Sequence, residues 1–317
     1  MQPSRRGFRV ALLAEVSVVA LAAASPDASA ADMASPPLLK KAPAPLPPQS
    51  TWSWWVEGGA FNTGGGSVGF PAFKPNWGGE GAIGFDWQAQ PLWHVIGQFR
   101  YGTASKSPST QFSFISGPST VNVGENQNLR EDHWLVDFGI GRDFGLGNSN
   151  AMWTFGVRVA DLRSKLNGNF SISTVGASPS PTTIAIQEKS TFVGAWPRLG
   201  VQGDVPLGGQ WGIDWAGGVA ALVGERTLTI TANTAGMAFA GSQTDTPVIF
   251  NLDAQAGLSY WINPNLKFTV GYRFDDYFKA LKTATVTSNI GATTPTVAAT
   301  SIDRSYSGPV VRLTSKF

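Results

Sequence analysis

From Thr51 to the end of the chain, apolar residues alternate with polar or small ones in many short segments. The segment Trp211–Val223 is the clearest, with tryptophan, isoleucine and valine on one side of the alternation and glycine, aspartate and alanine on the other. Successive side chains point to opposite faces of a β-strand, so this pattern predicts strands with one apolar and one polar face. The last stretch, Gly308–Phe317, alternates in the same way. Both transmembrane β-barrels and soluble β-sandwiches alternate like this.

The lengths of the connections distinguish these two architectures. Strict alternation of short and long connections is expected of a barrel with one end in the periplasm and the other outside the cell. The sequence therefore predicts an all-β, antiparallel, up-and-down transmembrane β-barrel with short periplasmic turns and long extracellular loops. The short connections are residues 88–91, 144–150, 207–210 and 263–265, and the long polar ones are 62–76, 104–128, 165–189, 224–245 and 279–302.

Counting strands through this pattern gives about ten, an even number that brings both chain ends to the periplasmic side. Two long segments contain further strand-like runs, Ile184–Gln187 and Thr227–Ala232. These runs either extend the barrel above the membrane or raise the count to twelve. The predicted strands are 52–61, 77–87, 92–102, 130–142, 151–163, 190–203, 211–223, 246–260, 266–278 and 303–317.

Tryptophans recur near the short turns, where amphipathic rings favour a membrane interface. In a soluble fold the same residues would form a core. A barrel must also pair its last strand with its first, because an open edge in lipid would leave backbone groups without partners. This requirement gives the apolar C-terminal strand a structural role. The tryptophans are Trp54, Trp93, Trp153, Trp211 and Trp261.

The composition supports a lipid-facing surface. Charged residues make up 14% of the chain, against roughly 25% in soluble proteins, while the hydrophobic fraction is an ordinary 42%. The chain has no cysteine, which excludes a disulfide scaffold, a thiol nucleophile and cysteine-ligated metal sites.

The first 30 residues have the layout of a cleaved signal peptide. Three arginines precede the apolar run Val10–Ala24, and Ala28-Ser29-Ala30 is a small-x-small cleavage site. Glu15 in the apolar run leaves a non-cleaved anchor as an alternative. Residues 31–50 contain six prolines and are interpreted as a periplasmic tether, with a proline motif that binds a partner as the alternative. Residues 51–317 then form the barrel.

Cleavage after Ala30 would leave 20 basic and 19 acidic residues. This near-neutral balance does not suggest nucleic acid as a partner.

Three stretches carry a family resemblance. The terminal strand Tyr306–Phe317, with Phe317 last, resembles the assembly signal of Gram-negative outer-membrane barrels. Its SYSGPVVRL core, GYRFDDYFKAL at Gly271–Leu281 and WWVEGGAF at Trp54–Phe61 resemble strands of the Legionella-type family of pore-forming major outer-membrane proteins. The segment ADMASPPLLKKAPAP is similar to the start of a neighbouring family, the small porin-like barrels of alpha-proteobacteria, but the usual WTGFYVG opening is replaced here. The resemblance implies an outer-membrane location, contact with lipid, and recognition of the last strand by the assembly machinery.

The polar face of the predicted strands carries charges of both signs. We interpret it as the lining of a small water-filled pore for passive diffusion of hydrophilic solutes or ions, with no cofactor. The alternative is a plugged structural barrel, or an adhesin-like one that acts through its extracellular loops; the resemblance favours the pore. The residues assigned to this face are Glu57, Asp86, His94, Gln98, Arg100, Asp137, Arg158, Arg198, Asp214, Asp253, Lys267, Arg273 and Arg312.

An enzyme is not expected. His133, at the predicted outer end of the fourth strand beside Glu131 and Asp132, is the one candidate for a general base. However, no motif supplies a nucleophile, and neighbouring residues on a strand point to opposite faces. Two distant histidines without cysteine also argue against zinc. The oligomeric state is left open.

Overall fold

The computed structural model describes residues 51–67, 74–75, 77–116, 119–145, 150–175, 182–234, 237–287 and 296–317. All of them belong to the second of the chain's two units, Pro48–Phe317. None of the described residues forms a helix that is long and apolar enough to cross a membrane. The predicted signal peptide (1–30) and tether (31–50) lie outside the described residues.

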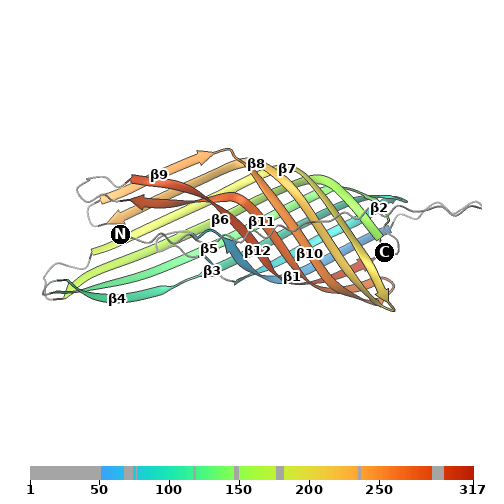
Figure 1. Ribbon diagram of the computed structural model, residues 1–317, viewed down its shortest axis with the longest axis horizontal. Helices are drawn as coiled ribbons and strands as arrows, with labels where there is room; N and C mark the ends of the chain where they lie inside the picture. Colours follow the sequence, from blue (N-terminus) through green and yellow to red (C-terminus); the bar gives the residue numbers. More distant parts are fainter. Residues whose placement is uncertain are drawn as a thin grey trace, which may run out of the picture. The chain divides into compact units, whose positions relative to one another are not determined.

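The described unit consists of antiparallel strands, drawn in Figure 1. The alternating segments of the sequence form these strands, and most strands pair with their neighbours in the chain. The strands are β1 (Thr51–Gly65), β2 (Trp77–Gln90), β3 (Trp93–Lys106), β4 (Ser109–Ser116), β5 (Ser119–Asp143), β6 (Asn150–Val175), β7 (Thr182–Gly208), β8 (Trp211–Thr234), β9 (Met237–Asp245), β10 (Val248–Asn263), β11 (Leu266–Thr287) and β12 (Thr296–Lys316).

Ten of the described strands close into a ring, in the order β1, β2, β3, β5, β6, β7, β8, β10, β11 and β12. At the seam between β12 and β1, Glu57 lies opposite Arg312 and Thr63 lies opposite Tyr306. The backbone N–H of Phe317 donates to the carbonyl of Trp52 over 2.8 Å. The predicted ten-stranded barrel is therefore confirmed. That Phe317 serves as an assembly signal stays a prediction.

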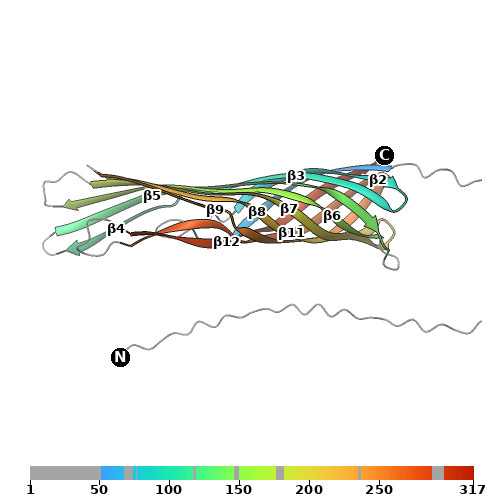
Figure 2. The same cartoon turned by 90° about the horizontal axis from the view of Figure 1, so that it is seen from above.

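At the end with the long connections, the sheet continues beyond the ring (Figure 2). β5, β6 and β7 have 25, 26 and 27 residues, although a strand needs only about 9–11 residues to span a membrane. β4 pairs with the far part of β5, and β9 with that of β8. We call these parts of β4–β9 the extracellular sheet. With β4 and β9, the described residues form twelve strands, of which ten form the ring. The two predicted counts, ten and twelve, thus correspond to the ring and to the whole sheet.

The strands extend further into the long polar segments than alternation indicated. Ile184–Gln187 is part of β7 and Thr227–Ala232 is part of β8, so neither forms a separate strand. These two runs alternate apolar with polar or small residues, and the predicted extension of the barrel through them is confirmed. Pairing continues because the neighbouring strands extend in the same register.

Apolar side chains on the outer face form a belt around the ring. It runs from the short turns to the level of Tyr101, Trp134 and Val193, which occupy related register positions on β3, β5 and β7. This belt supplies the lipid-facing surface that the low charge content predicted. Its exposed members include Val56, Phe99, Phe138, Phe155, Leu199, Ile213, Leu252, Val270 and Leu313.

The predicted tryptophan girdle is mostly on this outer face. Trp54, Trp153 and Trp211 are exposed, and the rings of Trp93 and Trp153 lie 6.1 Å apart. Trp261 differs, because the ammonium groups of Lys267 and Lys316 lie over its ring. It therefore belongs to the mouth of the barrel.

β11 kinks between Tyr277 and Leu281, where the register with β12 shifts. Lys279 has a positive φ of 56°, a conformation that few residues other than glycine adopt. After the kink, three consecutive side chains, Ala280 to Lys282, are all buried. The far parts of β11 and β12 thus lie against other parts of the barrel and not only against each other.

The seam between β12 and β1 yields a testable prediction. A Cβ on Gly308 would lie 2.0 Å from the carbonyl oxygen of Ala60, whereas a Cβ on Gly58 would meet nothing within 4 Å. Gly308→Val should therefore destabilise the barrel by about 1–3 kcal/mol, the usual cost of overpacking, and Gly58→Val should not. The measurement is urea unfolding in detergent, followed by the gel mobility of the folded form. Equal stability of the two variants would contradict this account of the seam.

Candidate functional site: the barrel interior

The residues assigned to the polar face in the sequence lie on the inner side of the ring. Register links them across neighbouring strands, as in the pairs Gln98–Asp137 and Asp137–Arg158. They divide into two groups at different depths. Asp86, His94, Asp214 and Lys267 lie near the short turns, and the others lie deeper. Their contact with a solute stays a prediction.

A polar chamber of about 440 Å³ occupies the half of the barrel next to the short turns. In its wall, the ring of His94 lies between two carboxylates, with Nδ1 2.7 Å from Asp86 and Nε2 3.1 Å from Asp143. Lys267 Nζ is 2.9 Å from Asp214. The charges of this wall are thus paired with one another.

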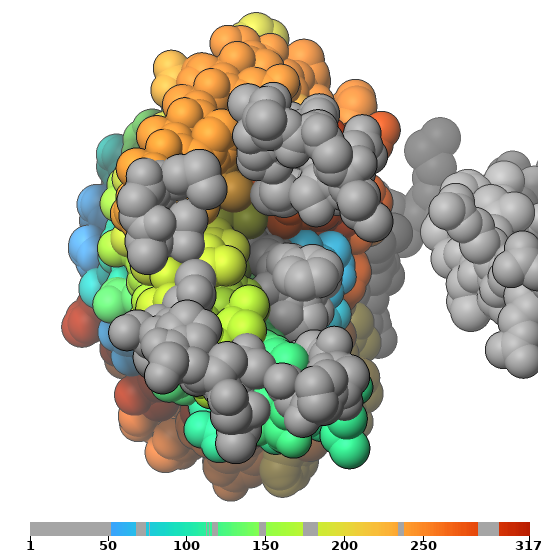
Figure 3. Space-filling view, turned by 90° about the vertical axis from the view of Figure 1, so that its left-hand side faces the viewer, coloured from blue at the N-terminus to red at the C-terminus, as the bar shows by residue number. Residues whose placement is uncertain are grey.

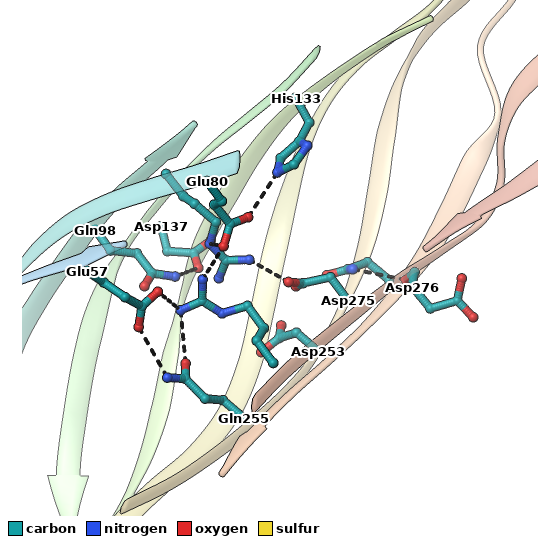
Figure 4. A network of polar contacts seen from close by, with 12 residues as sticks. Glu57, Glu80, Gln98, His133, Asp137, Asp253, Gln255, Asp275 and Asp276 are labelled. Carbon is teal, nitrogen blue, oxygen red and sulfur yellow. Dashed lines mark hydrogen bonds and ion pairs between the residues drawn. The ribbon is translucent and has the colours of Figure 1, made fainter. Parts of the chain in front are cut away.

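Deeper in the barrel, the chamber ends at a layer of arginines and carboxylates, which we call the arginine layer (Figure 4). Among the described residues it contains equal numbers of positive and negative groups, so its net charge is zero. Such pairing is required, because an unpaired charge inside a protein is strongly unfavourable. The members are Arg100, Arg158, Arg198, Arg273 and Arg312 with Glu57, Glu80, Asp137, Asp253 and Asp275.

Arg158 is the most buried group of this layer, with no exposed side-chain surface. It donates to both oxygens of Asp137, over 2.7 and 2.6 Å, and to Asp253 over 2.7 Å. Arg198 donates to the other carboxylate oxygen of Asp253 over 2.6 Å. Strands β5, β6, β7 and β10 are thereby joined across the interior.

A second set of contacts joins the opposite strands. Arg273 donates to Glu80 over 2.5 Å and pairs with Glu57, which also accepts from Arg312 over 3.0 Å. Gln255 accepts from both of these arginines. Arg100 pairs with Asp275 at 2.5 Å. The layer therefore spans the ring from β1 to β12.

Sequence reasoning did not assign Glu80 and Asp275 to the inner face. The signal was present, because Glu80 has the same parity along its strand as Asp86, and Asp275 the same parity as Arg273. The strand pattern alone could have placed them on the inner face. It could not have shown which arginine each carboxylate would meet.

His133 lies inside the barrel, and its expected position at the outer end of the strand is wrong. It is buried, and its Nε2 is 3.0 Å from Glu80 of the arginine layer. Its ring also packs on Tyr306, with centroids 4.1 Å apart. The error arose because the ring of strands extends beyond this residue, which the polar neighbours Glu131 and Asp132 had suggested was the rim.

Beyond the arginine layer, apolar side chains fill the interior. We call them the apolar layer; each is at most 1% exposed. They come from β5, β6, β7, β8, β10 and β11, so they meet from several sides of the ring. The members are Leu129, Leu135, Leu162, Phe192, Leu222, Ile249 and Leu281.

The kinked part of β11 covers this layer on the extracellular side. The backbone N–H of Lys282 donates to Ser190 over 2.8 Å, and that of Ala284 donates to Glu188 over 3.2 Å. Lys282 Nζ is also 3.0 Å from Asp245, which accepts two bonds from Arg226. These contacts attach β11 to the inner faces of β7, β8 and β9.

Outside these contacts, the barrel ends in a hollow. Figure 3 shows it between β8 and β9 (orange) and β4 and β5 (green), with β6 and β7 (yellow-green) behind. In the part of the chain that the structure describes, no group of three or more histidine, aspartate or glutamate residues could hold a metal ion. The site is thus a filled interior with a polar chamber on one side.

Comparisons with solved structures identify the architecture. The outer membrane protease OmpT from Escherichia coli has 11% identity, with 86% of this chain and 98% of that chain covered and a TM-score of 0.51. The translocator domain of the autotransporter NalP from Neisseria meningitidis has 12% identity over 86% and 90% of the two chains, with a TM-score of 0.36. A major outer membrane protein from Thermus thermophilus has 12% identity over 84% and 99%, with a TM-score of 0.31. At 11% identity, the similarity to OmpT concerns the fold alone. The other two structures have TM-scores below 0.5, and no conclusion is drawn from them.

No curated protein matches the sequence. The family model of the Legionella pneumophila major outer membrane protein precursor matches residues 73–317. This range includes two of the three stretches on which the resemblance was based, and Trp54–Phe61 precedes it. The chain belongs to the family of the Legionella pneumophila major outer membrane protein and is a β-barrel of the Gram-negative outer membrane.

Proposed function

We propose that the protein is a closed outer-membrane barrel that anchors and displays its extracellular sheet, and that it is not an open diffusion pore in this conformation. One observation carries this proposal: the apolar layer fills the interior with side chains that are at most 1% exposed. A continuous column of water would wet these side chains. The pore expected from the sequence is therefore the second candidate.

The dimensions of the barrel support the same conclusion. The interior of a small barrel is only wide enough for its own side chains, and here ten strands form the ring. The arginine layer and the apolar layer lie in series along it, and β11 covers the second. A solute would have to displace all three.

A pore is favoured by the polar chamber of about 440 Å³ and by the kink at Lys279. If the far part of β11 left β7 and β8, the chamber would be separated from the outside by the two layers alone. In this second candidate, the structure would represent the closed state of a pore. Conductance distinguishes the two candidates.

We further propose that the barrel is not an enzyme. His133, the candidate general base, pairs with Glu80 and is 3% exposed. A substrate could not reach it without opening the interior.

The first prediction concerns the stability that the arginine layer provides. Arg158→Met would leave Asp137 without its main partner and would remove one of the two arginines that bind Asp253. The free energy of unfolding should therefore fall by about 3–5 kcal/mol. Urea unfolding in detergent measures it. Arg130→Met is the matched control and should change little, because Arg130 pairs with Asp132 while 58% exposed. Equal stability of the two variants would show that the layer does not hold the barrel together.

The second prediction tests closure. The purified protein in a planar lipid bilayer should give no discrete ohmic steps, because the two layers exclude a water column. Folded protein recovered from the same preparation is the control for a silent recording. Steps whose ion selectivity shifts when Arg100 or Arg273 is neutralised would refute the closed barrel and establish a pore lined by these residues.

The third prediction concerns acid release of β11. Hydrogen bonds from Arg226, together with Lys282, lower the pKa of Asp245 from 3.8 to about 2. Ionised Asp245 therefore stabilises the contact above pH 3.8, and this contribution is lost as the pH falls towards 2. Burial raises the pKa of Glu188 above 4.5, so Glu188 titrates outside this window.

Hydrogen exchange at the Lys282 and Ala284 amides measures this release. Protection in the wild type should fall between pH 4 and pH 2, whereas Asp245→Asn should be weakly protected and flat over this range. A wild type as flat as the variant would exclude Asp245 as the group that attaches β11.

A further inference from the structure

Three cationic residues stand side by side on the outer wall of the barrel. Arg130 on β5 lies directly opposite Lys165 on β6, and Lys165 lies directly opposite Lys189 on β7. All three side chains are exposed. Neighbouring strands lie about 4.8 Å apart, so the row spans about 10 Å. We call these residues the basic row.

The charges of the basic row are only partly balanced. Arg130 pairs with Asp132 at 2.9 Å, and the nearby Arg163 pairs with Asp161 at 2.5 Å. Within the described residues, neither Lys165 nor Lys189 has a carboxylate within salt-bridge distance. Like charges directly opposite each other on paired strands are destabilising. A bound anion would remove this cost.

The depth of the row indicates what kind of anion it meets. Tyr101 and Trp134, which lie opposite each other, mark the edge of the apolar belt four residues below Arg130 on β5. Aromatic rings of this kind lie at the level of lipid headgroups. The basic row therefore stands just above that level, within reach of a lipid phosphate.

Amide side chains lie one step further out on the same strands. Asn128 is opposite Asn167, and Asn167 is opposite Gln187, whose amide donates to it over 2.8 Å. Amides donate and accept hydrogen bonds and so suit sugar hydroxyls. Along β5–β7 the wall thus presents apolar groups, then aromatic rings beside Asp161, then Asp132 and Arg163, then the basic row and finally the amides. Asp132 and Asp161 are each held in an ion pair with an arginine.

The other wall of the barrel lacks this arrangement. On β11 and β12 the outer side carries two carboxylates instead, Asp276 and Asp303, whose charges act on each other. An anionic headgroup would be repelled there. The cations gather on β5–β7, so a diffuse attraction around the whole barrel does not describe them.

We propose that β5, β6 and β7 form a binding site for a phosphorylated glycolipid of the outer leaflet. Its acyl chains would lie on the apolar belt, a phosphate on Lys165 and Lys189, and its sugars against the amides. Guanidinium and ammonium groups bind phosphate through charge-assisted hydrogen bonds. The site is on the outer surface of β5–β7, so it does not depend on whether the lumen is open.

Native mass spectrometry of the full protein, purified in detergent with EDTA, tests the site. The probe is bisphosphorylated lipid A, compared with its dephosphorylated form. Lys165→Gln should weaken binding of the phosphorylated lipid about tenfold and leave binding of the dephosphorylated lipid unchanged. Lys279→Gln, which removes an exposed lysine of β11, is the matched control and should bind like the wild type.

Three results would overturn the proposal. Equal affinity of Lys165→Gln and wild type for the phosphorylated lipid would exclude the basic row. A loss of equal size in Lys279→Gln would indicate general attraction to net charge. Displacement of the lipid by millimolar inorganic phosphate would identify free phosphate as the ligand in place of a lipid. Urea unfolding of both variants in the same detergent checks that each remains folded.

Discussion

The structure depends on one constraint: a strand in lipid must have all its backbone hydrogen bonds satisfied by other strands. The pairing of β12 with β1, to the last residues of the chain, meets this requirement by closing the ring. Closure then dictates the rest of the fold. It turns one face of every strand towards lipid and the other towards a narrow interior that the chain's own side chains must fill.

In that interior, the buried arginines are matched by an equal number of carboxylates. Arg158 lies between Asp137 and Asp253 at the centre of this arginine layer. The apolar layer and the attached part of β11 then separate it from the outside. The same barrel therefore combines polar residues, as a pore would need, with a closed cross-section. On the outer wall of β5–β7, the groups change with distance from the belt, from aromatic rings to the basic row and then to amides. The extracellular sheet continues this wall away from the membrane.

Much of this could be predicted from the sequence. Alternation identified the ten strands of the ring, the even count and the inner face of residues such as Arg273 and Asp253, because parity along a strand fixes the face of each side chain. Parity would equally have found Glu80. His133 was misplaced because the polar residues around it suggested an end of the strand. The runs Ile184–Gln187 and Thr227–Ala232 indicated part of the extracellular sheet, and β7 and β8 extend through them. β4 and β9 were not predicted, because only their pairing partners define such short strands within long polar segments.

The sequence by itself determined the architecture and the two faces of each strand, since both follow from local alternation and from the need to close a barrel in lipid. Only the tertiary structure decided which charges meet, as Arg100 and Asp275 do across 175 positions of the chain. It also decided that the interior is filled and that Arg130, Lys165 and Lys189 stand in one row. The reason is that contacts between strands depend on register and on the radius of the ring, and neither is encoded in the period of any single strand.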